Sequence, residues 1–440
     1  MISRRCFLGR AGLAALVASV PSQVGGQGQV SSGGAAFHVV RARPGFAGLR
    51  GDGQTPTAIW GYDGAVPGPV LRVKRDEGVI VRLINDLAEE TTLHWHGVRV
   101  ANAMDGVPHL TQAPVAPAES FEYRFTPPDA GTFWYHPNPF ASEQLDRGLY
   151  GALIVDEAEP VSVDRDVLLL LKDWRLGPSG SLGAAGSDTG EDFTVNAQSS
   201  LEVPVRTNER LRLRLINASW ARPMSLGFDQ HRVTVMAVDG QPAEPFVARD
   251  GHVALGPGNR LDLFLDMTLA PGSAARMVAA GRDGAVSLVR FAYDVGAAAR
   301  LAPLADPKPL PANPLPARID LRNALRLDLP IDPAHWTDGS VAASGRYGPP
   351  LFSAKRGRTV VIACANRTAD IAVLHLHGHH ARLLDNLDDG WKPFWLDTIM
   401  VAAQQTARFA FVADNRGKWL IDCRPLGRVT AGLGVWFEVA

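Results

Sequence analysis

The sequence predicts an all-β protein of three tandem domains, because strand-like runs dominate it and one strand pattern recurs along its length. Short runs alternate apolar and polar residues with a period of two, and Gly, Pro, Asn and Asp fill the gaps. No long stretch shows helical periodicity. Many short strands separated by turn signals are typical of β-sandwiches and barrels. The clearest runs cover residues 78–85, 120–125, 210–219, 260–267, 359–366 and 406–412.

The recurring element is a strand of alternating residues that ends in Asn. Its copies are VIVRLINDL at 79–87, LRLRLINAS at 211–219 and VVIACANRT at 360–368. They lie about 130 to 150 residues apart, which indicates tandem domains. We interpret the Pro-rich stretch 299–319 as the linker before the third copy. The predicted domains cover residues 36–157, 158–297 and 298–440.

Residues 1–34 are interpreted as an export signal that is absent from the mature protein. Arg4 and Arg5 precede a short apolar run, as in bacterial twin-arginine signals, and we expect cleavage between positions 21 and 34. The run is too short for a permanent membrane helix, and Cys6 precedes it, so no anchor is expected. The alternative is an ordinary secretory signal with a chance Arg pair. We therefore expect the protein in the periplasm.

Charge and cysteine content exclude several classes of partner. The 440-residue chain has a formal net charge of −1 and no basic block, so neither nucleic acid nor a membrane surface is expected as a partner. We expect a monomer, whose protein or small-molecule partner the sequence does not identify. Only Cys364 and Cys423 remain after processing, too few for a disulfide scaffold, although a single bridge stays open.

Histidines stand in the spacing of metal ligands at three places. His94 and His96 form one His-x-His pair, His375 and His377 form another, and His136 follows the strand-like GTFWY. On a strand, residues i and i+2 point to the same face, so each pair projects together. The pairs can share an ion only if the first and third domains meet. A lone His is more often a core or surface residue, but two pairs beside glycines favour an inter-domain site for copper or zinc.

The segments around these histidines resemble the multicopper oxidases, the family of laccases and cuprous oxidases. The resemblance rests on LHWHGVRVANAMDGVPHLTQAPVAPAESFEYRF, GTFWYHPN, GLYGALIV, HLHGHHARLLDNLDDGWKPFWLDTIMV, INASWARPMSLGF and VMAVDGQP. It covers nearly the whole mature chain. It implies three cupredoxin domains, each a Greek-key β-sandwich or barrel. It also implies a type 1 copper in the last domain and a trinuclear type 2/type 3 cluster between the first and last.

Carried over residue by residue, the copper ligand set is incomplete. The resemblance makes His94 and His375 type 2 ligands, and it makes His96, His136 and His377 type 3 ligands. The family's fourth motif is His-Cys-His, with a histidine five residues after the Cys and usually a Met ten after; only Cys423 of it is kept. The substituted ligand positions are Asn138, Ala372, Asp422, Arg424, Arg428 and Leu433.

These substitutions predict the loss of blue-oxidase chemistry. A type 1 site needs two His and a Cys thiolate, and without it no electrons reach the cluster. Asp422 and Arg424 flank Cys423, so on a strand both face away from it, toward the missing type 3 ligands. A buried Arg needs a carboxylate partner, so we expect Arg424 to act as an internal cation in place of type 3 copper. The alternative is that the region has opened to water and both groups are solvated.

For the remaining histidines and large side chains we expect structural roles or positions near the site without metal binding. His379 and His380 are expected behind the ligands or on the surface. Cys364 is expected in the core, and no Met-rich run indicates a path for cuprous ions. Residues expected to be structural are His109, His231 and His335, with Trp134 and Trp395 as core aromatics beside the site.

Three functions remain open from the sequence. The first is an exported protein of this family with a lost type 1 site and a partly lost cluster, binding at most one copper and not acting as a conventional laccase. The second is a copper-dependent oxidoreductase with a non-standard site, in which Asn138 and Asp422 replace imidazoles. The third is a copper-free periplasmic scaffold or cell-envelope or division protein. A two-domain nitrite-reductase-like enzyme fits poorly because it needs a type 1 site. No catalytic residue is assigned.

Overall fold

The computed structural model describes most of the chain from residue 29 onward. The described residues are 29–30, 35–138, 142–183, 189–331, 337–338, 347–384, 394–425 and 433–440. Among them strands predominate, with one α-helix, α1 (Ser142–Arg147), and the 3-10 helices η1 (Asn102–Met104) and η2 (Arg249–Gly251). The predicted all-β class is therefore confirmed. No helix in this part is long and apolar enough to cross a membrane. Arg4, Arg5, Cys6, His335 and Arg428 lie outside the described residues.

The first two sheets are built from strands in residues 29–156. These are β1 (Gln29–Val30), β2 (Ala36–Ala47), β3 (Thr57–Tyr62), β4 (Leu71–Lys74), β5 (Val79–Asn85), β6 (His94–His96), β7 (Ser120–Phe125), β8 (Gly131–His136) and β9 (Gly151–Asp156). One sheet has the order β1-β2-β5-β7, with β3 on β2, and the other has the order β4-β9-β8-β6. We call this part the first domain.

The next two sheets form the middle domain. Its strands are β10 (Arg165–Trp174), β11 (Asp192–Val195), β12 (Leu201–Val205), β13 (Arg210–Asn217), β14 (Met224–Phe228), β15 (Val233–Val238), β16 (Gln241–Val247), β17 (His252–Leu255), β18 (Arg260–Asp266), β19 (Ala274–Gly281) and β20 (Gly284–Tyr293). The sheet orders are β11-β10-β13-β18-β15-β16 and β12-β20-β19-β14-β17.

The last two sheets form the third domain. Its strands are β21 (Leu325–Ile331), β22 (Thr337–Asp338), β23 (Ser353–Ala354), β24 (Arg358–Asn366), β25 (Ala372–Leu376), β26 (Ala381–Leu384), β27 (Thr398–Val401), β28 (Thr406–Ala413), β29 (Gly417–Pro425) and β30 (Leu433–Val439). The sheet orders are β21-β24-β28-β26 and β22-β30-β29-β25-β27, with β23 on β30.

A buried Asn ends the corresponding strand of each domain, and this is the recurring element seen in the sequence. Asn85, Asn217 and Asn366 end β5, β13 and β24, which pair in parallel with β2, β10 and β21. Each side-chain amide donates to a carbonyl four or five residues on and to another far along the chain. Each side-chain oxygen accepts from the N–H two residues on. The same local turn therefore closes the strand three times.

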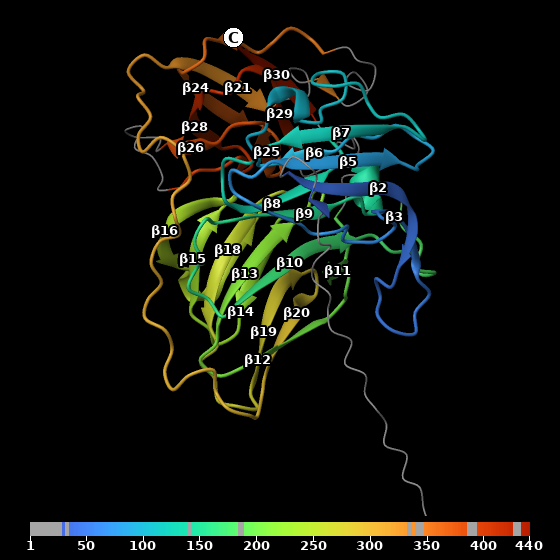
Figure 1. Cartoon of the computed structure of the whole chain (residues 1–440), viewed down its shortest axis with the longest axis vertical. Helices are drawn as coiled ribbons and strands as arrows, with labels where there is room; N and C mark the ends of the chain where they lie inside the picture. Colours follow the sequence, from blue (N-terminus) through green and yellow to red (C-terminus); the bar gives the residue numbers. More distant parts are fainter. Residues whose placement is uncertain are drawn as a thin grey trace, which may run out of the picture.

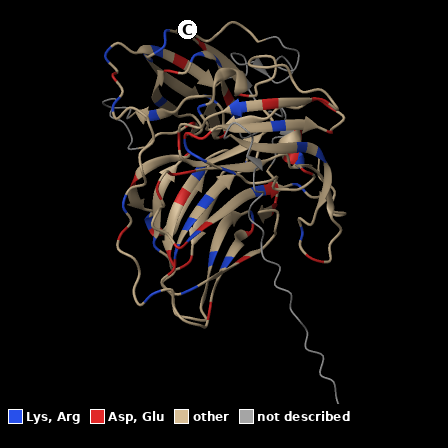
Figure 2. Ribbon diagram, in the orientation of Figure 1, with Lys and Arg blue, Asp and Glu red and all other residues tan. Residues whose placement is uncertain are grey.

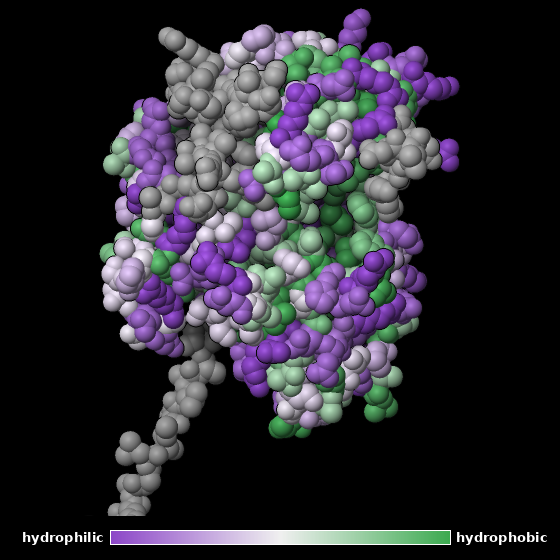
Figure 3. All heavy atoms as spheres, turned by 180° about the vertical axis from the view of Figure 1, so that it is seen from behind, coloured by the Kyte–Doolittle hydropathy of each residue, from purple (hydrophilic) through white to green (hydrophobic). Residues whose placement is uncertain are grey.

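Each domain has its own apolar core, and the first domain contacts both of the others. In Figure 1 the first domain (blue to teal) lies beside the third (orange to red) and above the middle one (green to yellow). Strand β8 packs on β13 and β18, and η1 packs on β29. Seen from behind, the surface mixes hydrophilic and hydrophobic residues, with hydrophobic ones gathered in a hollow at mid-height (Figure 3).

Strand β13 is buried on both faces, although its sequence RLRLRLIN alternates arginine with apolar residues. Its arginines are buried and paired with carboxylates. Figure 2 shows basic and acidic residues on the strands of the middle domain. Arg212 donates to Asp262 and to Glu157, and Arg214 donates to Thr132 on β8. Buried charges require such pairing, so the polar face of this strand serves as the joint between the first and middle domains.

Candidate metal centre

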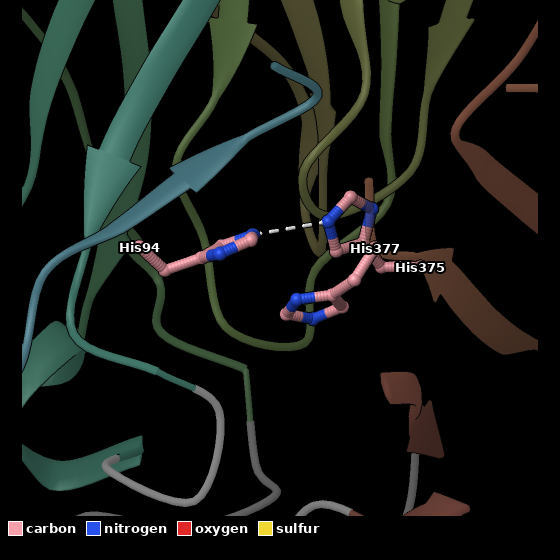
Figure 4. A group of neighbouring side chains, drawn as sticks. All are labelled: His94, His375 and His377. Carbon is pink, nitrogen blue, oxygen red and sulfur yellow. Dashed lines mark hydrogen bonds between the residues drawn. The ribbon is translucent and has the colours of Figure 1, made fainter. Parts of the chain in front are cut away.

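The five histidines converge where the first and third domains meet. Strand β6 pairs with β8, which sets His94 opposite His136, and all five side chains are buried. His375 lies on β25 and His377 follows it, both facing His94 from the other domain (Figure 4). The ring nitrogens of His94, His375 and His377 lie within 4.8 Å of one another, as do those of His94, His96 and His136.

Carbonyl groups determine which nitrogens of the type 2 pair face inward. His94 Nδ1 lies 2.8 Å from the Asp105 carbonyl and His375 Nδ1 lies 3.1 Å from the Asp397 carbonyl. A carbonyl only accepts, so both Nδ1 atoms carry the proton and both Nε2 atoms carry a lone pair. The two Nε2 atoms are 3.1 Å apart. Neutral lone pairs at that distance repel unless a proton or a metal ion lies between them.

The Asp105 and Asp397 side chains stand behind the histidines, and sequence reasoning missed both. Asp105 Oδ2 accepts from His377 Nδ1 at 2.9 Å, and Asp397 Oδ1 lies 3.5 Å from His96 Nε2. Thr398 Oγ1 lies 2.8 Å from His96 Nε2. Carboxylates behind metal-binding imidazoles fix ring orientation and raise ligand basicity. The available signal was an acidic residue in each of the motifs NAMDG and FWLDT.

Burial and these carboxylates give the two histidines of the third domain, His375 and His377, different pKa values. Burial lowers the pKa of His375 to about 4, despite its contact with Asp397. Burial also lowers the pKa of His377, but Asp105 and Asp422 outweigh it and raise that pKa to about 9. At neutral pH His375 is therefore neutral and His377 holds a proton, which a metal ion must displace.

Arg260 of the middle domain bonds to residues of both domains that supply the histidines. Its guanidinium donates to both Asp397 oxygens, at 2.8 and 2.5 Å, and to the Thr132 carbonyl of the first domain at 3.2 Å. Arg260 and Asp397 are both fully buried. The backbone directly after His96 passes very close to Arg260. A Cβ on Gly97, whose φ is +87°, would lie 2.1 Å from Arg260 Nη2. Only glycine fits there.

Two of the type 1 positions, Cys423 and Ala372, form part of an apolar core. Cys423 pairs across strands with Leu374 and with Leu433 of β30, and it belongs to the same core cluster as Ala372. Burial raises the pKa of Cys423, so its thiol stays protonated. Cys364 and Cys423 are both free and buried, so the single bridge left open by the sequence is absent from the structure. A neutral thiol beside Ala372 does not fit a type 1 copper.

Asp422 and Arg424 are buried, so the alternative of a region opened to water is wrong. They are 2% and 3% exposed. Strand β29 pairs with β25 and sets Asp422 opposite His375. Arg424 Nε lies 3.7 Å from Asp422 Oδ2, and its guanidinium carbon lies 4.9 Å from the ring of Trp220 and 6.0 Å from that of Trp134. Residues of all three domains therefore surround this cation.

Several polar atoms here have no hydrogen-bond partner among the described residues. They are Asn138 Oδ1 and Nδ2, His377 Nε2, Asp422 Oδ1, and Arg424 Nη1 and Nη2. Most buried polar groups in proteins are hydrogen-bonded, so these atoms mark a polar region within the buried junction of the domains. Arg424 also lowers the pKa of His136, although less than burial does. A guanidinium beside that histidine does not fit a type 3 copper pair.

The other predicted residues take supporting places. His379 and His380 are buried, so the surface alternative for them is wrong; His380 Nε2 lies 3.3 Å from Asp397 Oδ2. His231 is structural, with Nε2 2.6 Å from the Tyr293 hydroxyl. Trp134 lies against His136, with ring centroids 4.0 Å apart. His109 is exposed in a left-handed turn, and Trp395 packs in a small cluster with Ile319.

Comparison with known proteins gives the family. Three models described as "Multicopper oxidase" match residues 48–160, 166–286 and 320–440. A solved multi-copper oxidase from Pseudomonas thermotolerans superposes with a TM-score of 0.81 at 33% identity, covering 92% of this chain and 100% of that one. The chain therefore belongs to the multicopper oxidase family, as the motifs predicted.

Two sequence relatives show how far the likeness extends. "Multicopper oxidase MmcO" of Mycobacterium tuberculosis is 28% identical, over 84% of this chain and 81% of that protein. "Laccase-3" of Oryza sativa subsp. japonica is 29% identical over 56% of this chain, which spans only 48% of that protein. The family is thus established over most of the chain, whereas the substrates and activities of these relatives are not assigned to it.

Replacing Arg260 by Leu is expected to lower the free energy of unfolding by about 3–5 kcal/mol, because Asp397 is left as a buried unpaired charge. Denaturant unfolding measures this change. The control is Arg290→Leu, which removes an exposed ion pair to Glu202 and is expected to change stability by less than about 1 kcal/mol. Equal stability losses in the two variants would contradict the structural role of Arg260.

Proposed function

We propose that this chain is an exported multicopper-oxidase-family protein that binds at most one copper, in a type 2-like site, and is not a conventional laccase. The observation that carries the proposal is the 3.1 Å approach of His94 Nε2 and His375 Nε2, with each Nδ1 occupied by a carbonyl. Two nitrogens bound at 2.0–2.1 Å to one tetrahedral ion lie about 3.3 Å apart. The pair therefore fits a single ion with little movement.

The chain's own residues position and shield the ion rather than supply electrons to it. Copper bound there supplies a Lewis acid and a one-electron couple. Asp105 and Asp397 orient the imidazoles through their carbonyls, and burial excludes bulk water. Cys423 is a protonated thiol in an apolar core, so the usual route for substrate electrons is missing. We therefore expect no four-electron oxidase turnover.

Specific contacts favour each of the two alternatives. A copper oxidoreductase with a non-standard site is supported by Asp422 Oδ1, which lies 3.7 Å from His377 Nε2 as an oxygen donor. A copper-free periplasmic scaffold is supported by the His377–Asp105 ion pair and the buried Arg424, which stabilise the domain contact without a metal. Metal content of the purified protein and a phenol oxidation assay separate the three functions.

Copper titration is expected to saturate at about one ion per chain, and His94→Ala or His375→Ala should abolish tight binding. These two residues face each other across the junction of the first and third domains, so removing either one breaks the pair that carries the proposal. Dialysis followed by metal analysis gives the stoichiometry. His109→Ala, an exposed histidine in a turn, is the control and should bind as the unchanged protein does. Unchanged binding in both site variants would rule the site out.

The copper-loaded protein is expected to show no intense visible thiolate-to-copper band. The reason is that Ala372 and Arg428 stand where the family has the two histidines that bind type 1 copper together with the cysteine. Absorption spectroscopy after loading and dialysis measures this. Cys423→Ser should give the same spectrum as the unchanged protein. An intense band that this variant loses would show that a type 1 site exists after all.

Export is expected to depend on the arginine pair, so Arg4→Lys with Arg5→Lys should leave precursor in the cytoplasm. Fractionation of a bacterial host with a twin-arginine pathway measures the distribution. Arg10→Lys, outside the pair, should be exported normally. Periplasmic accumulation of the double variant at the normal level would refute the targeting prediction.

A further inference from the structure

We infer that His377 and Asp422 complete a mononuclear site of three imidazoles and one carboxylate for a single divalent transition-metal ion, and that Arg424 takes the place of a second metal. The inference rests on the proposed one-copper function. It adds two ligands, of which Asp422 replaces an imidazole, and it limits the metal to ions that accept an oxygen donor.

Outer partners turn all three imidazoles the same way. His94 and His375 donate from Nδ1 to backbone carbonyls, and His377 donates from Nδ1 to the Asp105 carboxylate. Each Nε2 is therefore directed to the common space, where the three ring nitrogens lie within 4.8 Å of one another. Such outer-shell bonds are the usual way in which a protein prepares imidazoles to bind a metal ion.

An ion pair between two atoms that lack hydrogen bonds identifies the fourth ligand. His377 Nε2 and Asp422 Oδ1 are 3.7 Å apart, both buried, and neither has a hydrogen-bond partner among the described residues. At 3.7 Å they are too far apart for a hydrogen bond and close enough to share one ion. Three imidazole nitrogens and a carboxylate oxygen suit Zn²⁺ and Cu²⁺ and disfavour Cu⁺, which prefers sulfur.

Arg424 explains why one ion is the limit. Its Nε lies 3.7 Å from Asp422 Oδ2, so the carboxylate presents one oxygen to the site and the other to the guanidinium. The rings of Trp220 and Trp134 hold the cation in place. A second metal ion beside His136 would meet this fixed positive charge in a water-poor environment, where like charges repel strongly.

The experiment titrates the full-length protein separately with Cu²⁺ and Zn²⁺ and records the electron paramagnetic resonance spectrum of the Cu²⁺ form. Asp422→Asn keeps the shape of the side chain and removes its charge, and is expected to weaken both metals about 10-fold or more and to change the copper hyperfine splitting. The control is Asp328→Asn, an exposed carboxylate on β21 of the same domain, which should change neither.

Asp422→His keeps a metal-binding atom at this position. It is the second variant to be measured if Asp422→Asn does not fold. It should bind copper with an added nitrogen ligand in the spectrum. A spectrum identical to that of the unchanged protein in either variant overturns the role of Asp422, while the one-copper function stands if His94→Ala still abolishes binding. If His94→Ala and His375→Ala bind normally, the proposed function fails as well.

The role of Arg424 is tested by stoichiometry. Asp422→His with Arg424→His should raise the number of bound copper ions from about one to about two per chain, because the repelling cation is gone and two imidazoles are gained. Asp422→His alone should stay at about one. A double variant that also stays at about one overturns the assignment of Arg424.

Discussion

The buried ion pair between Arg260 and Asp397 is the interaction on which the candidate centre depends. Arg260 comes from the middle domain, Asp397 from the third, and Arg260 also donates to the Thr132 carbonyl of the first. Asp397 in turn contacts His96, His375 and His380. A charge pair taken out of water is stable only when every remaining donor and acceptor is used. Here the imidazoles supply those contacts. The ion pair that joins the domains therefore also positions the histidines.

The same constraint explains why the middle domain presents so much charge to its neighbours. Arg212 and Arg214 of β13 pair with Asp262, Glu157 and Asp166. The hydrogen bonds from Arg214 to Thr132 and from Thr132 to Asp262 have geometric requirements that an apolar contact lacks, so they constrain the orientation of β8. His136 ends β8 and His94 stands beside it on β6. The position of the first domain's ligands is therefore set partly by charges that never touch the site.

Sequence reasoning succeeded where the determining interaction is local. Period-two strands, the Asn-terminated repeat and the projection of His94 with His96 all follow from neighbouring residues, and strand alternation also placed Asp422 and Arg424 opposite Cys423. It could not find the pairing of Arg260 with Asp397, because they lie 137 residues apart and nothing in either segment indicates the other. Nor could alternation show that the arginine face of β13 is buried, since burial there depends on a second domain.

The internal cation and the retained imidazoles together favour a metal-binding protein over a pure scaffold. A scaffold needs only a stable contact between the first and third domains, and apolar residues of similar volume do that at least as well as buried charges. The structure instead keeps the Nε2 atoms of His94 and His375 facing each other, with both outward nitrogens already bonded. That arrangement is unfavourable while both nitrogens carry lone pairs, and it becomes favourable when a metal ion or a proton lies between them. Asp422 and Arg424 form an ion pair in the neighbouring space, so the proposed site at His94 and His375 does not need a further metal ion beside it.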